Sequence, residues 1–171
     1  SDVCSSDLYI NDNNMEITID MLDQIAKLKV TEGKIEDLLN LEKGSNDVSE
    51  ILYYLGLDWI NTNFKYEQDH LHPENRFNES KPYNITNEDW KNWRSIRNRL
   101  PNLQLLEGRT NGSKNDMRLI DYCNDMNDEQ KAIFFKQAMI PQNVSLEFDN
   151  FEEFYEARKK ILKDKIYELL K

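Results

Sequence analysis

Turn-forming residues are scarce in this chain, and that scarcity most constrains its fold. The 171 residues include only 5 glycines and 4 prolines, while 32% of the residues are charged. An all-β fold needs many more chain breaks, so this composition favours helices. Hydrophobic residues make up 39% of the chain, which supports a packed interior and argues against a disordered chain. No stretch approaches the roughly 18 apolar residues of a membrane span, and 2 cysteines are too few for a disulfide scaffold.

Apolar spacing predicts a mainly helical fold with one small, hairpin-like strand pair at its centre. Helices are expected over residues 17–30, 35–41, 45–55, 86–99, 111–124, 128–139 and 150–170. Alternating polar and apolar residues predict short strands over residues 63–68 and 102–106. Residues 107–110 read as a turn.

The chain divides into three expected regions. Residues 1–8, SDVCSSDL, have no initiator Met and resemble a translated sequencing adapter, although a natural terminus or a cloning scar is an alternative. For residues 9–60 we expect a helical support layer that contains no cluster of His, Cys or paired carboxylates. Residues 61–171 predict the domain that carries the function. We interpret the natural chain as extending upstream of this sequence.

Charge is unevenly distributed. The net charge is −10, which by itself argues against a nucleic-acid binder. Between residues 91 and 118, however, seven basic residues stand against Glu107 and Asp116, a local excess of five positive charges. They are Lys91, Arg94, Arg97, Arg99, Arg109, Lys114 and Arg118. A local basic stripe is what contacts to a phosphate backbone require, although a solvated helix face is the simpler reading for Arg94 and Arg97.

Both histidines of the chain fall in one polar segment. His70 and His72 lie in the run Asp69-His70-Leu71-His72-Pro73, after the first predicted strand. A lone histidine is usually structural, whereas two histidines beside an aspartate indicate metal binding or general base chemistry. Both readings are open for His72: contact with phosphate or metal, or a structural role in the loop.

The order of these side chains resembles the HNH, or ββα-metal, endonuclease motif in its His-Asn-Asn form. Asp69 and His70 end the first strand, Asn102 opens the second, and Asn111 stands nine residues further on, followed by Lys114. The segments YEQDHLHP, LPNLQLLEG and NFEEFYEARK resemble the C-terminal half of GmrSD-like restriction proteins. In that family a ParB-like nucleotide-binding domain precedes the HNH nuclease domain. The resemblance covers about residues 61–171, and nothing here corresponds to the ParB-like domain.

Phosphodiester cleavage explains why these residue types occur together. One carboxylate and one amide oxygen, from Asp69 and Asn111, suit a hard cation such as Mg²⁺ or Mn²⁺ that keeps several waters. A neutral imidazole, that of His70, suits the general base. Asn102 is expected to fix either the loop or the ring of His70. Phosphate or DNA contacts are expected from Lys114, Arg109, His72, Arg97 and Arg99.

The resemblance therefore implies a mainly α fold with a small ββα-metal core, and a metal-dependent DNA endonuclease of bacterial restriction or anti-phage defence. Its expected partners are foreign DNA and the missing ParB-like domain, in the cytoplasm and away from membranes. The main alternative is an inactive HNH fold that binds DNA or protein. A third is an acidic helical adaptor in which the Asp-His pair is accidental. Core packing is the expected role of Cys123, Trp90 and Trp93.

Overall fold

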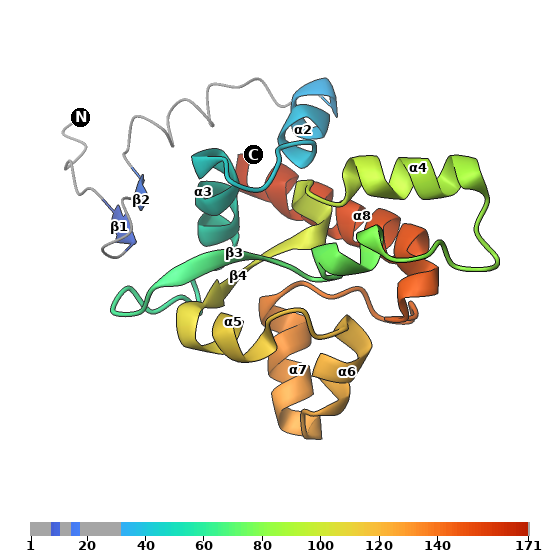
Figure 1. The fold of residues 1–171 in the computed structure, drawn as a ribbon. Helices are drawn as coiled ribbons and strands as arrows, with labels where there is room; N and C mark the ends of the chain where they lie inside the picture. The colour runs from blue at the N-terminus through green and yellow to red at the C-terminus, as the bar shows by residue number, and fades with distance from the viewer. Residues whose placement is uncertain (1–7, 11–14, 18–31, 171) are drawn as a thin grey trace.

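The computed structural model describes residues 8–10, 15–17 and 32–170, and these residues are mainly helical (Figure 1). Most of the adapter-like segment, Cys4 and nearly all of the expected helix 17–30 lie outside the described residues. A short antiparallel pair, β1 (Leu8–Ile10) and β2 (Met15–Ile17), precedes the main body and was not expected from the sequence. Among the described residues, no helix is both long and apolar enough to cross a membrane.

The predicted strand pair is present at the centre of the molecule. Strands β3 (Tyr66–His70) and β4 (Leu103–Glu107) pair antiparallel, with Asp69 opposite Gln104 and His70 opposite Leu103. Strand β3 begins and ends later than predicted, so Asp69 and His70 lie within the strand. In Figure 1 the helices α2, α3 and α4 lie on one side of this pair, and α5, α6 and α7 on the other.

The helices have the following bounds: α2 Glu32–Leu39, α3 Asn46–Leu55, α4 Asn87–Ile96, α5 Gly108–Lys114, α6 Leu119–Asn124, α7 Asp128–Gln137 and α8 Phe151–Leu170. Three 3₁₀ turns, η1 Glu74–Asn78, η2 Leu100–Asn102 and η3 Phe148–Asn150, complete the described elements.

Side-chain caps explain where several helices begin. Ser45 Oγ accepts a hydrogen bond from the Asp47 amide at the start of α3, and Thr86 Oγ1 accepts one from the Asp89 amide at the start of α4. Asn127 and Gln130 form a reciprocal capping box before α7. These bonds satisfy amide groups that the first turn of a helix leaves without partners, so the sequence predicted these starts well.

The prediction over residues 107–124 was wrong in two respects. The expected turn at residues 107–110 instead begins α5, because the Glu107 side chain accepts a hydrogen bond from the Thr110 amide and caps the helix. The expected single helix 111–124 is two helices, α5 and α6. Asn115, with φ of 43°, ends α5, since few residues other than glycine and asparagine adopt that left-handed conformation.

Helix α8 holds the molecule together. Its buried residues Phe151, Phe154, Tyr155, Arg158, Leu162 and Ile166 follow helical spacing along one face. Leu162 and Ile166 pack in one cluster with residues of α2 and α3 and with Leu103 and Leu105 of β4. The described part of the expected support region therefore shares a hydrophobic core with the β3–β4 pair.

Arg158 links α8 to the turn that precedes β4. Its fully buried guanidinium donates hydrogen bonds to the carbonyl oxygens of Leu100, Pro101 and Ala138, at distances of 2.9–3.2 Å. Buried carbonyl groups without donors are costly, so this arginine stabilises the backbone on which Asn102 is carried.

Candidate functional site

Asp69 lies on β3 and is almost completely buried. Its Oδ2 atom lies 3.0 Å from Nζ of Lys114 and accepts a hydrogen bond of 2.9 Å from Nε2 of Gln104, the residue opposite it on β4. The Lys114 side chain is 0% exposed and the Asp69 side chain 10%. Helix α5 and strand β4 thus both contribute a donor to this carboxylate.

His70 is held by a residue that the sequence did not single out. Its Nε2 atom lies 2.7 Å from Oδ1 of Asn98, just beyond α4. An amide oxygen only accepts, so with this orientation of Asn98 the ring donates through Nε2 and keeps a lone pair on Nδ1. Burial lowers the pKa of His70, against the opposing effect of the Asn98 hydrogen bond. The ring is therefore neutral at pH 7 and has one nitrogen able to take up a proton.

Asn102 fixes the loop after β3 rather than the ring of His70. Its Oδ1 accepts from the backbone amide of His72 at 2.9 Å, and its Nδ2 donates to the carbonyl oxygens of His72 and Arg97 at 3.0 and 2.8 Å. Asn102 itself is fully buried. Of the two expectations for this residue, the structure agrees with the loop.

His72 is in the protein interior, away from any site that a phosphate reaches. The side chain is 1% exposed, and its ring lies 4.7–5.9 Å, centroid to centroid, from those of Phe148, Phe151 and Phe154. Burial, helped by the charges of Lys114 and Arg76, lowers the pKa of His72 to about 3. A neutral, enclosed ring is not available for phosphate, so the geometry favours the structural reading of His72.

Asn111 lies on α5, where its Nδ2 donates a hydrogen bond of 2.6 Å to Oε2 of Glu67. Glu67 stands two residues before Asp69 on β3, and α5 packs against this strand. Residues two apart on a strand share a face, so Glu67 and Asp69 both face the helix that carries Asn111 and Lys114. The described contacts join Asn111 to Glu67 and Lys114 to Asp69.

Lys114 was expected to contact phosphate, yet its ammonium group is occupied within the protein. Besides the ion pair with Asp69, it donates a hydrogen bond of 2.8 Å to the carbonyl oxygen of His70, and it lies 5.7 Å from the centre of the Tyr122 ring. A positive charge is therefore fixed beside Asp69, on the same face of the strand pair as Asn111.

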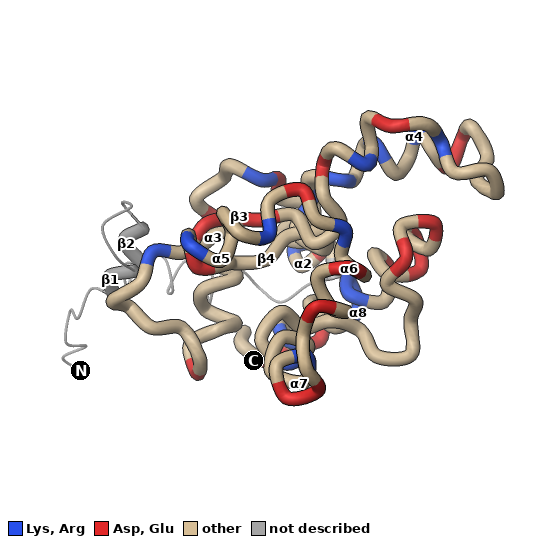
Figure 2. Tube along the Cα trace, turned by 60° about the horizontal axis from the view of Figure 1, so that its bottom comes forward, with Lys and Arg blue, Asp and Glu red and all other residues tan. Residues whose placement is uncertain are grey.

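The three arginines that were expected to contact phosphate or DNA differ in their exposure and in their partners within the protein. The Arg109 side chain is 81% exposed, although its Nε lies 3.1 Å from Glu107. Arg97 is partly covered and pairs with Glu74, and Arg99 donates to the side chain of Asn40. In Figure 2 basic positions occur along α4 and around the β3–β4–α5 unit, mixed with acidic ones.

Three contributing residues were missed by the sequence analysis: Glu67, Asn98 and Gln104. For two of these residues the sequence contained a signal that could have identified them. Glu67 precedes Asp69 by two residues on the same strand face, and Gln104 lies in the second strand, where antiparallel pairing sets it opposite Asp69. Asn98 had no such signal, because its contact with His70 depends on how α4 packs.

The donors at this site suit a hard divalent cation. Over the described residues, no group of three or more His, Cys, Asp or Glu side chains gathers to hold a metal ion. The available donors are oxygen atoms: Oδ1 of Asp69, Oδ1 of Asn111, which its bond to Glu67 leaves unused, and the Glu67 carboxylate. Sparse oxygen donors fit Mg²⁺ or Mn²⁺ and do not fit Zn²⁺.

Cys123, Trp90 and Trp93, for which the sequence predicted core packing, do pack in the interior or at its edge. Cys123 is 1% exposed, and burial raises the pKa of its thiol to about 11, so it is an inert core residue. Trp93 is buried among Phe148 and Phe151, and Trp90 packs at the edge of the same cluster.

Comparison with known proteins does not assign this chain to a family, since no protein-family model and no curated protein matches it.

Proposed function

We propose that this protein is a metal-dependent DNA endonuclease that hydrolyses phosphodiester bonds. The observation that supports the proposal is the strand–strand–helix unit β3–β4–α5. On it, Lys114 of the helix pairs with Asp69 and donates to the backbone carbonyl oxygen of His70, while Asn111 of the same helix binds Glu67. The neutral ring of His70, the next residue of β3, binds Asn98. This arrangement combines an acidic oxygen ligand, a base and a fixed positive charge.

His70 acts as the general base. Its Nδ1 accepts a proton from the attacking water while Asn98 holds Nε2, which keeps the ring in one tautomer and one orientation. The water oxygen forms a bond to phosphorus, and the bond from phosphorus to the 3′ oxygen breaks. The 3′ oxygen takes a proton from solvent, so the products are a 5′-phosphate and a 3′-hydroxyl.

Asp69 and Asn111 would hold the cation, and Glu67 orients the Asn111 amide so that its carbonyl oxygen faces away from the Glu67 carboxylate. When bound, Mg²⁺ or Mn²⁺ supplies Lewis-acid polarisation of a phosphate oxygen. Lys114 adds a fixed positive charge next to Asp69, which favours an anionic phosphate at the same place.

The biological setting follows from the resemblance alone. We propose a role in bacterial restriction or anti-phage defence, in the cytoplasm, with foreign DNA as substrate and an upstream ParB-like domain as the partner that supplies specificity. The exposed Arg109 and the basic side of α4 are the surfaces proposed to contact the DNA backbone.

A plasmid-nicking assay tests the proposal. The whole chain is incubated with supercoiled plasmid and Mg²⁺ or Mn²⁺, beside an EDTA control and the His70→Ala variant. We expect metal-dependent nicking that His70→Ala abolishes while folding and Mn²⁺ binding, measured by calorimetry, persist. Asp69→Asn is expected to weaken Mn²⁺ binding itself.

The same assay separates the alternatives. Folded protein that binds DNA but does not nick it with either metal contradicts the proposal and favours an inactive HNH-fold binding module. Neither salt-dependent DNA binding nor stabilisation by metal is expected of an acidic helical adaptor.

A further inference from the structure

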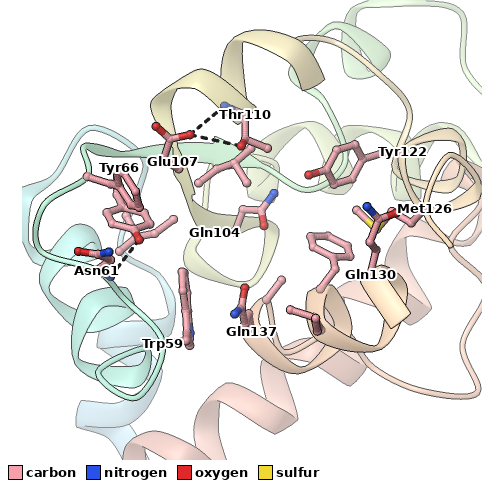
Figure 3. Close-up of a pocket in the computed structure, with 16 residues that line it drawn as sticks. Trp59, Asn61, Tyr66, Gln104, Glu107, Thr110, Tyr122, Met126, Gln130 and Gln137 are labelled. Atoms are coloured by element: carbon pink, nitrogen blue, oxygen red, sulfur yellow. Dashed lines mark hydrogen bonds between the residues drawn. The ribbon is translucent and has the colours of Figure 1, made fainter. Parts of the chain in front are cut away.

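A pocket of about 410 Å³ opens beside the candidate site, on the side of the strand pair that α6 and α7 cover (Figure 3). Figure 3 shows Trp59 on one side of the pocket, Tyr122 and Met126 on the other, and Gln104 and Gln137 between them. Its volume lies in the range of about 300–1,000 Å³ that small-molecule sites occupy.

The lining of the pocket favours a flat, uncharged ring. Aromatic side chains from four different segments line it, namely Trp59, Tyr66, Tyr122 and Phe134. Glu107 is the one charged residue among the lining residues, and no lysine or arginine is among them. A phosphate or a carboxylate therefore has no counter-charge here, whereas an aromatic ring has surfaces on which to stack.

Side-chain amides provide a hydrogen-bonding edge for such a ring. Gln104, Gln130 and Gln137 all line the pocket. Gln104 donates through Nε2 to Asp69, which leaves its side-chain carbonyl oxygen as an acceptor. Within the described part of the chain, no hydrogen bond involves the side-chain amide of Gln137. An amide offers a donor next to an acceptor, which is the pattern displayed by the edge of a nucleobase.

Gln104 joins the pocket to the candidate site. It lines the pocket and also donates directly to the Asp69 carboxylate. Thr110 of α5 lines the same pocket, one residue before Asn111. A ligand in the pocket is therefore one side chain away from the proposed cation ligands.

We propose that this pocket receives one nucleobase, unstacked from the DNA strand whose phosphate lies at the candidate site. The proposal rests on the proposed nuclease function for the source of the base, and on the lining of the pocket for its chemistry. An unstacked base needs a stacking surface and hydrogen-bond partners to replace those it loses in the duplex. Trp59 and the amides of Gln104 and Gln137 supply both.

The test uses 2-aminopurine, a fluorescent base that is excited at wavelengths where tryptophan does not absorb. The whole chain is titrated, in EDTA so that no cutting occurs, into a duplex oligonucleotide that carries 2-aminopurine at each position in turn. A second series contains a mismatch opposite the 2-aminopurine. A separate arm uses the free 2-aminopurine deoxyriboside.

We expect a change in 2-aminopurine emission at one position of the bound duplex, and tighter binding of the mismatched duplex, since less pairing has to be broken. Ile133→Trp fills the pocket from α7 at a residue that is 48% exposed, so folding is preserved. It should remove the emission change and weaken binding of the mismatched duplex about tenfold. Leu169→Trp, at a comparably exposed position outside the pocket lining, is the matched control and should bind like the parent.

Three results overturn the proposal. The first is the absence of any emission change in the bound duplex, and the second is a change that Ile133→Trp leaves intact. The third is a response of the free deoxyriboside without one in the duplex, which would assign the pocket to free nucleosides. Plasmid nicking by the same preparation keeps the two proposals apart. Nicking without an emission change contradicts only the base pocket, and an emission change without nicking contradicts only the nuclease.

Discussion

The ammonium group of Lys114 lies 3.0 Å from Oδ2 of Asp69, and both side chains are withdrawn from solvent. A buried ion pair is strongly destabilised when one partner is lost, because the other charge is left in a medium of low dielectric constant. The pair links α5 to β3, so it also fixes the distance between the helix and the strand that carry the candidate site.

Replacing one member of this pair is expected to destabilise the protein more than replacing both. Lys114→Met leaves the Asp69 carboxylate buried without its cation and should lower the free energy of unfolding by about 3–5 kcal/mol. The double variant Lys114→Met/Asp69→Asn should recover part of that loss. Urea denaturation measures both, with Lys160→Met at an exposed position of α8 as control. Equal stability of Lys114→Met and Lys160→Met would show that the pair contributes nothing.

Asn98 should affect the pH dependence of nicking through His70. Its hydrogen bond raises the pKa of His70 against the lowering effect of burial, so Asn98→Ala should lower that pKa further. The base is active when neutral, and the acid limb of the rate–pH profile is therefore expected to move to lower pH. The maximal rate should fall, since the ring loses its fixed orientation. Asn92→Ala, on the exposed side of α4, should leave the profile unchanged, and an unshifted limb in Asn98→Ala would refute this role.

Glu67 is expected to act through Asn111 on metal affinity. Removing a residue that orients a metal ligand typically costs about 10–100-fold in affinity, so Glu67→Ala should weaken Mn²⁺ binding by about tenfold or more. Calorimetric titration measures this without any dependence on cutting. Glu129→Ala, on the outer first turn of α7, removes the same charge elsewhere and serves as control. Unchanged Mn²⁺ affinity in Glu67→Ala would contradict the assignment.

Asn102 is expected to contribute to the stability of the protein and to have no direct part in the reaction. Asn102→Ala removes three hydrogen bonds to the backbone, two of them buried, and should cost about 2–4 kcal/mol of stability. Thermal denaturation checks this against Asn124→Ala at the exposed end of α6. A fully stable Asn102→Ala protein that no longer nicks DNA would instead give Asn102 a direct part in the reaction.

His72 should make the protein less stable in acid. The unfolded state takes up a proton near pH 6.5, whereas the folded state resists protonation until about pH 3. The contribution of His72 is therefore complete above pH 6.5 and is lost as the pH falls towards 3. His72→Phe places among the surrounding aromatic side chains a ring that cannot be protonated, so its stability should fall less than that of the parent between pH 7.5 and pH 4.5. Parallel urea titrations of the two proteins at these pH values measure the difference, and identical pH dependence would exclude His72 as its source.

Local rules account for the parts of the fold that the sequence predicted. Ser45, Thr86 and Asn127 cap helices through bonds that span two or three residues, and such bonds need no tertiary partner. The alternating residues of β3 and β4 identified the strand pair in the same way. The errors at Glu107 and Asn115 are also local: a side chain took the role of a cap, and one residue adopted a left-handed conformation.

The candidate site could be predicted only in part. The order of Asp69, His70, Asn102, Asn111 and Lys114 along the chain identified a strand–strand–helix unit and the residue types on it. The sequence could not predict which of these side chains contact each other, because Lys114 and Asn111 lie on one helix face and either could have met Asp69. Packing of α5 against β3 decided in favour of Lys114 with Asp69, and Asn111 with Glu67.

The sequence by itself determined the mainly helical class, the central strand pair, the helix caps and the segment that carries the candidate chemistry, since each depends on residues close together in the chain. Tertiary structure alone decided the difference between the two histidines. His70 meets Asn98, whereas His72 is enclosed by Phe148, Phe151 and Phe154 from a segment more than 70 residues away. Burial depends on long-range packing, and a two-residue separation in sequence carries no information about it.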